Sequence, residues 1–102
     1  MSICSEFVKD TLVVYISGDI DEHTAAGLRT RLDALLSEGG FARLVLNMRG
    51  VDFMDSTGIG MIIGRYKKLK RENIPVYVED VGKQMDKIFK LSGLYEIIGL
   101  VR

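Results

Sequence analysis

Two hydroxyl groups lie in the turn Asp55-Ser56-Thr57-Gly58, between a run typical of a buried strand and a pattern typical of a helix. Asp and Ser are both good N-cap residues, because a short side-chain oxygen accepts hydrogen bonds from the free amides of the first helical turn. A phosphate on Ser56 would add about −1.5 to −2 charges at a helix N-terminus, which favours negative charge. Beside Asp55, the same phosphate would repel a partner adapted to a neutral hydroxyl. The turn therefore predicts a modifiable serine that switches binding.

Catalytic and nucleotide-binding chemistry have weaker support. Ser56 lacks the Gly-x-Ser-x-Gly elbow of serine hydrolases, and His23 is the only histidine that could serve as a base. A Gly-x-Gly-x-x-x-Gly run at Gly58–Gly64 follows a strand and opens a helix, with Glu79 at the end of the next strand. This arrangement is a loose relative of the dinucleotide fingerprint, although no Walker lysine is present. A small nucleotide-binding domain is therefore kept as an alternative hypothesis.

The helix predicted after the turn has two faces of different character. Apolar residues recur at helical spacing at Ile59, Ile62, Ile63, Tyr66 and Leu69. The face turned away from the core carries Thr57, Gly60, Met61, Gly64 and Lys68. Glycines on an exposed helix face destabilise it by about 1 kcal/mol each relative to Ala. Either a partner's backbone approaches this nearly bare surface, with Met61 as an adaptable apolar contact, or the glycines pack against a neighbouring strand or loop of the chain.

A second polar loop, Gly18–Thr24, also lies between a predicted strand and a predicted helix. Asp21 or Thr24 can cap that helix. Asp19 and Asp21 are carboxylates separated by one residue, which could bind a cation or a basic partner residue, or could simply be solvated. Sites in parallel sheets form beyond the carboxyl ends of the strands. We therefore expect the two loops to lie side by side on one rim of the domain.

The composition is that of one globular domain spanning residues 1–102. Hydrophobic residues make up 47%, and 14 basic residues balance 14 acidic ones. The net charge of zero argues against a general binder of nucleic acid or of anionic membranes. Cys4 is the only cysteine, so an internal disulfide and a cysteine-rich metal site are excluded, and we expect no metal or cofactor. Because a membrane-length apolar stretch and a signal-peptide pattern are both missing, we expect a cytoplasmic protein.

Strands and helices alternate along the chain. The predicted strands are Ile3–Val8, Thr11–Ser17, Leu44–Met48 and Val76–Glu79, with Tyr95–Val101 as a short last strand or a segment packed on the sheet. The predicted helices are His23–Glu38, the helix after Asp55, and one capped by Asp80 that ends near Leu91. The first two strands form a hairpin around Lys9-Asp10, and the apolar run of the second predicts a central strand covered on both faces. This order predicts an α/β fold: a small mixed, mostly parallel sheet of four to five strands with an N-terminal β-hairpin and about three helices.

At these motifs the chain closely resembles the anti-sigma factor antagonists, the small bacterial members of the STAS domain family. The resemblance is carried by the loop Gly18–Ala25, the strand Leu44–Asn47, the motif Phe53–Gly60 around Ser56, and the late helix end Phe89–Leu94. Among subfamilies, Gly64–Lys67 and Leu91–Ile98 are most similar to the stage II sporulation antagonist. The sequence ends at Arg102, where relatives usually carry a further helix.

The resemblance implies a partner-switching regulator and not an enzyme. The unphosphorylated form would bind an anti-sigma factor serine/threonine kinase, which carries ATP, and would thereby release the sigma factor. That kinase would phosphorylate Ser56 and end the interaction, and a serine phosphatase would restore it. The implied result is positive regulation of sigma-dependent transcription in sporulation; a sensory or scaffolding STAS module is the alternative. The expected partner-binding residues are Asp21, Asp55, Ser56, Thr57, Gly58, Gly60, Met61 and Gly64.

Overall fold

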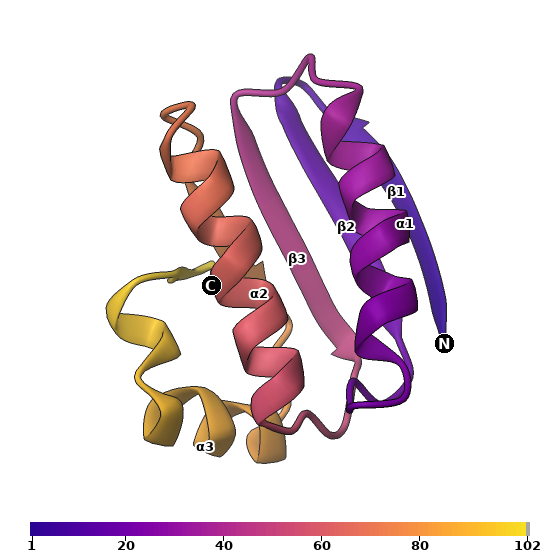
Figure 1. Ribbon diagram of the computed structural model, residues 1–102. Coiled ribbons are helices and arrows are strands. Elements are labelled where there is room, and N and C mark those ends of the chain that lie inside the picture. The colour runs from indigo at the N-terminus through magenta and orange to yellow at the C-terminus, as the bar shows by residue number, and fades with distance from the viewer. Residues whose placement is uncertain (102) are drawn as a thin grey trace.

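Five strands and three α-helices make up the computed structural model, which describes residues 1–101 (Figure 1). The elements are β1 (Ser2–Val8), β2 (Thr11–Ser17), α1 (Ala25–Ser37), β3 (Arg43–Gly50), α2 (Ser56–Lys70), β4 (Val76–Glu79), α3 (Lys83–Ser92), the 3-10 turn η1 (Leu94–Glu96) and β5 (Gly99–Val101). The strand order is β1-β2-β3-β4-β5, with β1 antiparallel to β2 and the other neighbours parallel. The predicted fold class is confirmed.

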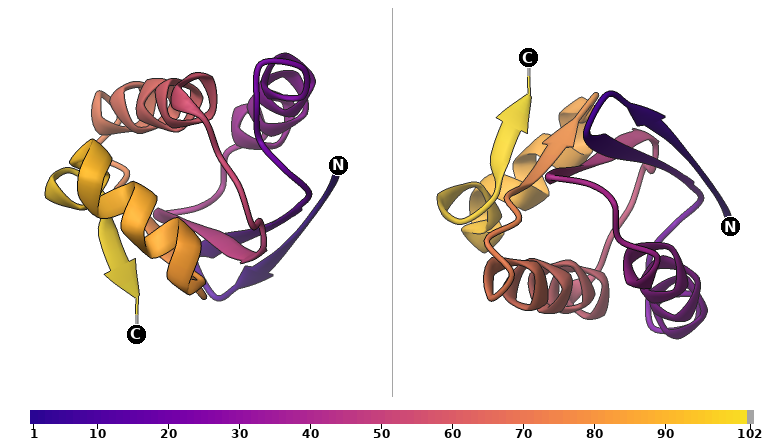
Figure 2. Two further views of the ribbon diagram at one scale, coloured as in Figure 1. Left: turned by 90° about the horizontal axis from the view of Figure 1, so that it is seen from below. Right: turned by 90° about the horizontal axis from the view of Figure 1, so that it is seen from above.

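Helices α1 and α2 lie side by side on one face of the sheet, as the two end-on views show (Figure 2). Strand residues that point toward them, among them Val14, Leu46 and Val78, are fully buried. The prediction that β2 is covered on both faces is wrong, because none of the helices within residues 1–101 lies over its other face. Val13, on that other face, is still only 7% exposed, since the flanking strands place Glu6 and Val45 beside it. The apolar run reflected burial by neighbouring strands, not a second layer of helices.

Helix α2 forms where the sequence predicts it. Asp55 is its N-cap, in extended conformation, and accepts a hydrogen bond from the Gly58 amide. The predicted apolar stripe faces the sheet: Ile59, Ile62 and Leu69 are buried, and Ile63 and Tyr66 pack partly buried against the core. Burying these side chains stabilises the helix far more than its intrinsic helix propensity does, which is weak because three of its residues are glycine.

The start of α3 differs from the prediction. Its N-cap is Gly82, and Asp80 does not cap it. Asp80 instead has a left-handed φ of 53°, and its carboxylate accepts a hydrogen bond of 3.0 Å from the Asn47 side chain. Asn47 is only 5% exposed and also donates to Glu79 at 2.9 Å. A buried amide on β3 therefore holds the end of β4, and its partner Asp80 is drawn away from the helix.

The carboxyl ends of β2 and β3 lead into the two polar loops at one end of the sheet. An isolated parallel bridge between Ile20 and Met54 joins these loops beyond the strands. The Ile20 amide donates to the Phe53 carbonyl at 3.0 Å, and the Asp55 amide donates to the Ile20 carbonyl at 3.1 Å. The expectation that the two loops are neighbours on one rim is confirmed. No helix within residues 1–101 is long and apolar enough to cross a membrane.

Candidate functional site

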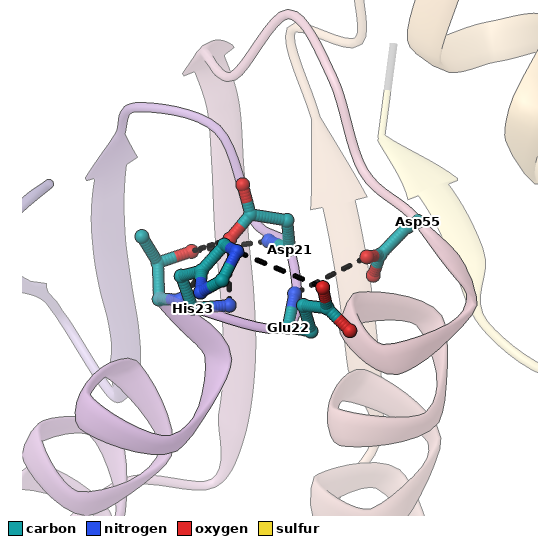
Figure 3. Close-up of polar contacts among 5 residues, drawn as sticks. Asp21, Glu22, His23 and Asp55 are labelled. Atoms are coloured by element: carbon teal, nitrogen blue, oxygen red, sulfur yellow. Dashed lines mark hydrogen bonds and ion pairs between the residues drawn. The ribbon is translucent and has the colours of Figure 1, made fainter.

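The loop before α1 is folded around Asp21. Its Oδ1 accepts hydrogen bonds from the His23 amide at 2.8 Å and the Thr24 amide at 3.1 Å (Figure 3). Thr24 Oγ1 accepts from the Asp21 amide at 3.0 Å and donates to the Asp19 carbonyl at 2.8 Å. Asp21 and Thr24 therefore engage the amides of the turn before α1. The prediction that one of them caps the helix is only partly right: Thr24 is the N-cap residue by position, but no side chain makes a cap hydrogen bond into the helix.

These hydrogen bonds also set the charge state of Asp21. The His23 amide, and after it the Thr24 amide and hydroxyl, lower the pKa of Asp21 below its ordinary value of 3.8, against a smaller opposing effect of burial. Asp21 is thus a fixed negative charge on the rim. Because Oδ1 is already engaged with amides of its own turn, the structure favours a turn-forming role over the cation-binding alternative for Asp19 and Asp21. Among residues 1–101, no cluster of three or more His, Cys, Asp or Glu side chains could hold a metal ion.

Asp55 links this loop to the start of α2. While Oδ1 caps the helix, Oδ2 accepts a hydrogen bond of 3.2 Å from the Glu22 amide (Figure 3). Both carboxylate oxygens of Asp55 are therefore engaged with backbone amides, one from each loop. The bond to Glu22 fixes how far Asp21 stands from the first turn of α2.

Ser56 is the first residue of α2, and its side chain is exposed. Its hydroxyl makes no hydrogen bond to any part of the chain that the structure describes. Thr57 is exposed beside it. A group added to Ser56 meets solvent and the positive end of the helix dipole, with the Asp55 carboxylate as its neighbour. The geometry can therefore accommodate a phosphate on Ser56 without unfolding α2.

His23 is not arranged as a catalytic base for Ser56. Its Nε2 lies 3.6 Å from Glu22 Oε1, and its side chain is 83% exposed. A nucleophilic serine needs a base within hydrogen-bond reach that is itself held by a third group. The surface pair of His23 and Glu22 has neither property, and this agrees with the weak support for catalysis in the sequence.

Gly58, expected at the partner surface, is buried instead. A Cβ on Gly58 would lie 2.5 Å from Met54 Cγ and 2.8 Å from both Ile20 Cγ2 and the Ile20 carbonyl oxygen. Contacts this short do not occur in folded proteins, so glycine is required for α2 to approach the Ile20 loop. Gly58 holds the two loops together and is not an accessible contact residue.

Met61, expected to face away from the core, is only 7% exposed and belongs to the hydrophobic core. The prediction treated α2 as packing on the sheet alone, whereas α1 packs beside α2, and Met61 lies between the two helices. Gly60 is exposed and Gly64 half-buried, and a Cβ on either would meet nothing within 4 Å. The alternative that these two glycines pack against another part of the chain is therefore wrong.

Three residues of the site were not predicted. Glu22 supplies the amide that holds Asp55, Ile20 supplies the bridge to Met54, and Phe53 is an apolar side chain that is 45% exposed on the rim. Phe53 could have been found, since an aromatic residue directly before a polar loop is a common contact residue. The roles of Glu22 and Ile20 rest on backbone atoms and leave no signal in residue type.

A family model described as the STAS domain matches residues 3–102. The chain is 32% identical over 98 residues to the anti-sigma F factor antagonist of Paenibacillus polymyxa, with 96% of this chain and 84% of that protein covered. It is also 32% identical over 92 residues to the anti-sigma-B factor antagonist of Bacillus subtilis strain 168, which covers 90% of this chain and 83% of that protein.

Solved structures give the same fold. SpoIIAA, an anti-sigma factor antagonist, in its unphosphorylated form superposes with a TM-score of 0.79 at 24% identity, over 99% of this chain and 89% of that one. An anti-sigma factor antagonist from Mycobacterium paratuberculosis superposes with a TM-score of 0.82 at 27% identity, over 97% of this chain and 83% of that one. The five-stranded sheet, the capped serine turn and the match over residues 3–102 lead to one conclusion: the chain belongs to the STAS domain family.

Proposed function

We propose that this protein is an anti-sigma factor antagonist switched by phosphorylation of Ser56. In its unphosphorylated form it binds an anti-sigma factor serine/threonine kinase that carries ATP, and the sigma factor is released. The kinase transfers a phosphate to Ser56, which ends the interaction, and a serine phosphatase removes it again. In this cycle the protein is the substrate of the kinase and has no catalytic step of its own.

The observation that carries the proposal is the position of the Ser56 hydroxyl. It is exposed at the N-terminus of α2, next to a carboxylate whose two oxygens are both held by backbone amides. Asp55 cannot readily turn away from a phosphate, because turning away would break the helix cap and the bond to Glu22. A phosphorylated surface would therefore present at least three negative charges, counting Asp21, where the unmodified one presents two. A partner fitted to the unmodified surface would lose affinity.

The relatives support the general function of an anti-sigma factor antagonist more than the assignment to sporulation. The two curated relatives compared above, an anti-sigma F and an anti-sigma-B factor antagonist, are equally identical to this chain. We assign the sporulation branch from the resemblance of Gly64–Lys67 and Leu91–Ile98 alone. Gene neighbourhood tests that assignment: a sporulation sigma factor and a kinase encoded next to this chain support it, and stress-response genes contradict it.

The nucleotide-binding alternative loses its main structural feature. In the dinucleotide fingerprint, an acidic residue at the end of the second strand binds the ribose, and Glu79 has that position in this sequence. In the structure, Glu79 accepts a hydrogen bond from Asn47 on the face of the sheet opposite α2. It therefore cannot act together with the glycines of α2 on one ligand. Calorimetric titration with ATP and GTP tests this, since tight binding that Gly60→Leu abolishes would restore the alternative.

The decisive experiment is phosphate transfer from labelled ATP by the anti-sigma factor kinase encoded in the same genome. Wild-type protein and Thr57→Ala should be labelled, and Ser56→Ala should not. Thr57→Ala is the matched control, because it removes the neighbouring exposed hydroxyl of the same helix turn. Ser56→Asp should bind the kinase at least tenfold more weakly than wild type. Labelling of Ser56→Ala, or unchanged affinity of Ser56→Asp, contradicts the proposal.

A further inference from the structure

A groove of about 320 Å³ runs between α1 and α2, starting at the rim that carries Ser56. The two helices lie side by side along it (Figure 1). The residues that line it are Glu22, Ala25, Ala26 and Arg29 from the α1 side and Thr57, Gly60, Met61, Gly64 and Arg65 from α2. Gly60 and Gly64 leave the α2 wall of the groove without side chains, and the largely buried Met61 also lines it.

The fold itself does not require the bare wall on α2. A Cβ on Gly60 or Gly64 would meet nothing within 4 Å, and glycine destabilises a helix relative to alanine. Gly58, two residues before Gly60, shows the opposite situation, because there a Cβ would collide with Ile20. Larger side chains at Gly60 and Gly64 would fill the groove, so their absence keeps it open.

Charge varies along the groove. Glu22 lies at its mouth, whereas Arg29 and Arg65 lie deeper in it. Arg65 Nε is 3.1 Å from Asp33 Oδ1, without the alignment of a hydrogen bond, and its buried Nη1 has no hydrogen-bond partner among residues 1–101. Arg29 is exposed, and it forms no ion pair within residues 1–101. Because Asp33 balances the charge of Arg65, the free positive charge at the inner end of the groove is that of the exposed Arg29 guanidinium, which has unused donors.

We propose that this groove receives a segment of the anti-sigma factor kinase, whose acidic side chain pairs with Arg29 while its backbone lies against Gly60 and Gly64. The inference rests on the proposed function, because it extends the contact around Ser56. The two surfaces are continuous, since Thr57 and Glu22 line the mouth of the groove and adjoin Ser56 and Asp55. Charge complementarity fixes the sign of the partner residue, because an acidic group is attracted to the unpaired Arg29 and a basic group is repelled by it.

The test measures the affinity of the purified kinase of the same genome for the full chain by calorimetry. Gly64→Leu fills the groove two turns away from Ser56, and Arg29→Glu reverses its free positive charge. Gly27→Leu and Lys67→Glu are the matched controls: Gly27 is an exposed glycine of α1 whose Cβ would also meet nothing within 4 Å, and Lys67 is an exposed base of α2 outside the groove. Thermal unfolding of every variant checks that it is folded.

The proposal expects Gly64→Leu and Arg29→Glu to bind at least tenfold more weakly than wild type, and both controls to remain within twofold. If the groove variants bind like wild type while Ser56→Asp does not, the groove is not a kinase contact and the proposed function stands. If the wild type neither binds the kinase nor is phosphorylated, the proposed function fails and this inference fails with it. Binding of ATP or GTP by the free protein that Gly64→Leu abolishes would assign the groove to a nucleotide and overturn the proposal.

Discussion

Asp55 and Glu22 are joined by a hydrogen bond of 3.2 Å between a carboxylate oxygen and a backbone amide, across 33 positions of sequence. The other oxygen of Asp55 accepts from the Gly58 amide at 3.1 Å. One side chain therefore begins α2 and also holds the loop that begins α1. This double role explains how Asp21 and Ser56, from distant parts of the chain, are presented on a single surface.

Replacing Asp55 should destabilise the fold. Asp55→Ala removes the N-cap of α2 and leaves the Glu22 amide without its acceptor, so we expect the free energy of unfolding to fall by about 1–2 kcal/mol. Urea denaturation followed by circular dichroism measures it. Asp52→Ala, at an exposed position of the same loop, should change stability by less than about 0.5 kcal/mol. An equal loss in the free energy of unfolding for the two variants would show that the hydrogen bonds of Asp55 contribute nothing to stability.

A methyl group at Gly58 should destabilise the fold for a different reason. Gly58→Ala brings a Cβ against Met54 and the backbone of Ile20, so the two loops must separate, and we expect a loss of about 1–3 kcal/mol in the free energy of unfolding. Gly27→Ala, on an open face of α1, should be neutral or slightly stabilising. Two-dimensional NMR of Gly58→Ala should show shifts concentrated at Ile20 and Met54. Unchanged stability would mean that the loops accommodate the methyl group without strain.

Much of the fold could be predicted because the sequence is locally consistent. The stripe from Ile59 to Leu69 matches one helix face, Asp55 is a favoured N-cap, and Gly93 ends α3 with a left-handed φ of 77°. Alternation of strands and helices was sufficient to place both polar loops on one rim. These features depend on residues within a few positions of each other, where spacing and residue type carry the information.

The errors concern contacts between segments far apart in sequence. Met61 was expected to face away from the core, but it is largely buried and lies between α2 and α1, and no local pattern shows where α1 lies. Gly58 resembles Gly60 in the sequence and differs from it only through its approach to Ile20. Asp80 has the residue type of a helix cap, yet the buried amide of Asn47 competes for its carboxylate. Tertiary partners thus decided each of these positions.

Filling the bare face of α2 with methyl groups should stabilise the protein. Gly60→Ala and Gly64→Ala remove helix-destabilising residues without a clash, so each should raise the free energy of unfolding by up to about 1 kcal/mol. Chemical denaturation of the single and double variants measures this, and the two gains should be close to additive. This change in the free energy of unfolding is opposite in sign to the one expected for Gly58→Ala on the same helix. A loss of stability at Gly60 or Gly64 would mean that the fold itself needs glycine there.

The charge of Asp21 should make stability depend on pH in the acid range. Hydrogen bonds, first that of the His23 amide, lower its pKa below the ordinary 3.8, so the folded protein holds the ionised form more firmly than the unfolded chain does. The resulting stabilisation is fully present above about pH 4 and is lost as the pH falls through the lowered pKa. Asp21→Asn cannot ionise, so the stability gap between wild type and this variant should be largest near pH 6 and shrink below 3.8. Urea midpoints at pH 6, 4 and 2.5 measure it, with Gly27→Ala as a non-titrating control whose gap stays constant. A gap for Asp21→Asn that is constant or widens toward acid would show that the amides of His23 and Thr24 do not favour the carboxylate.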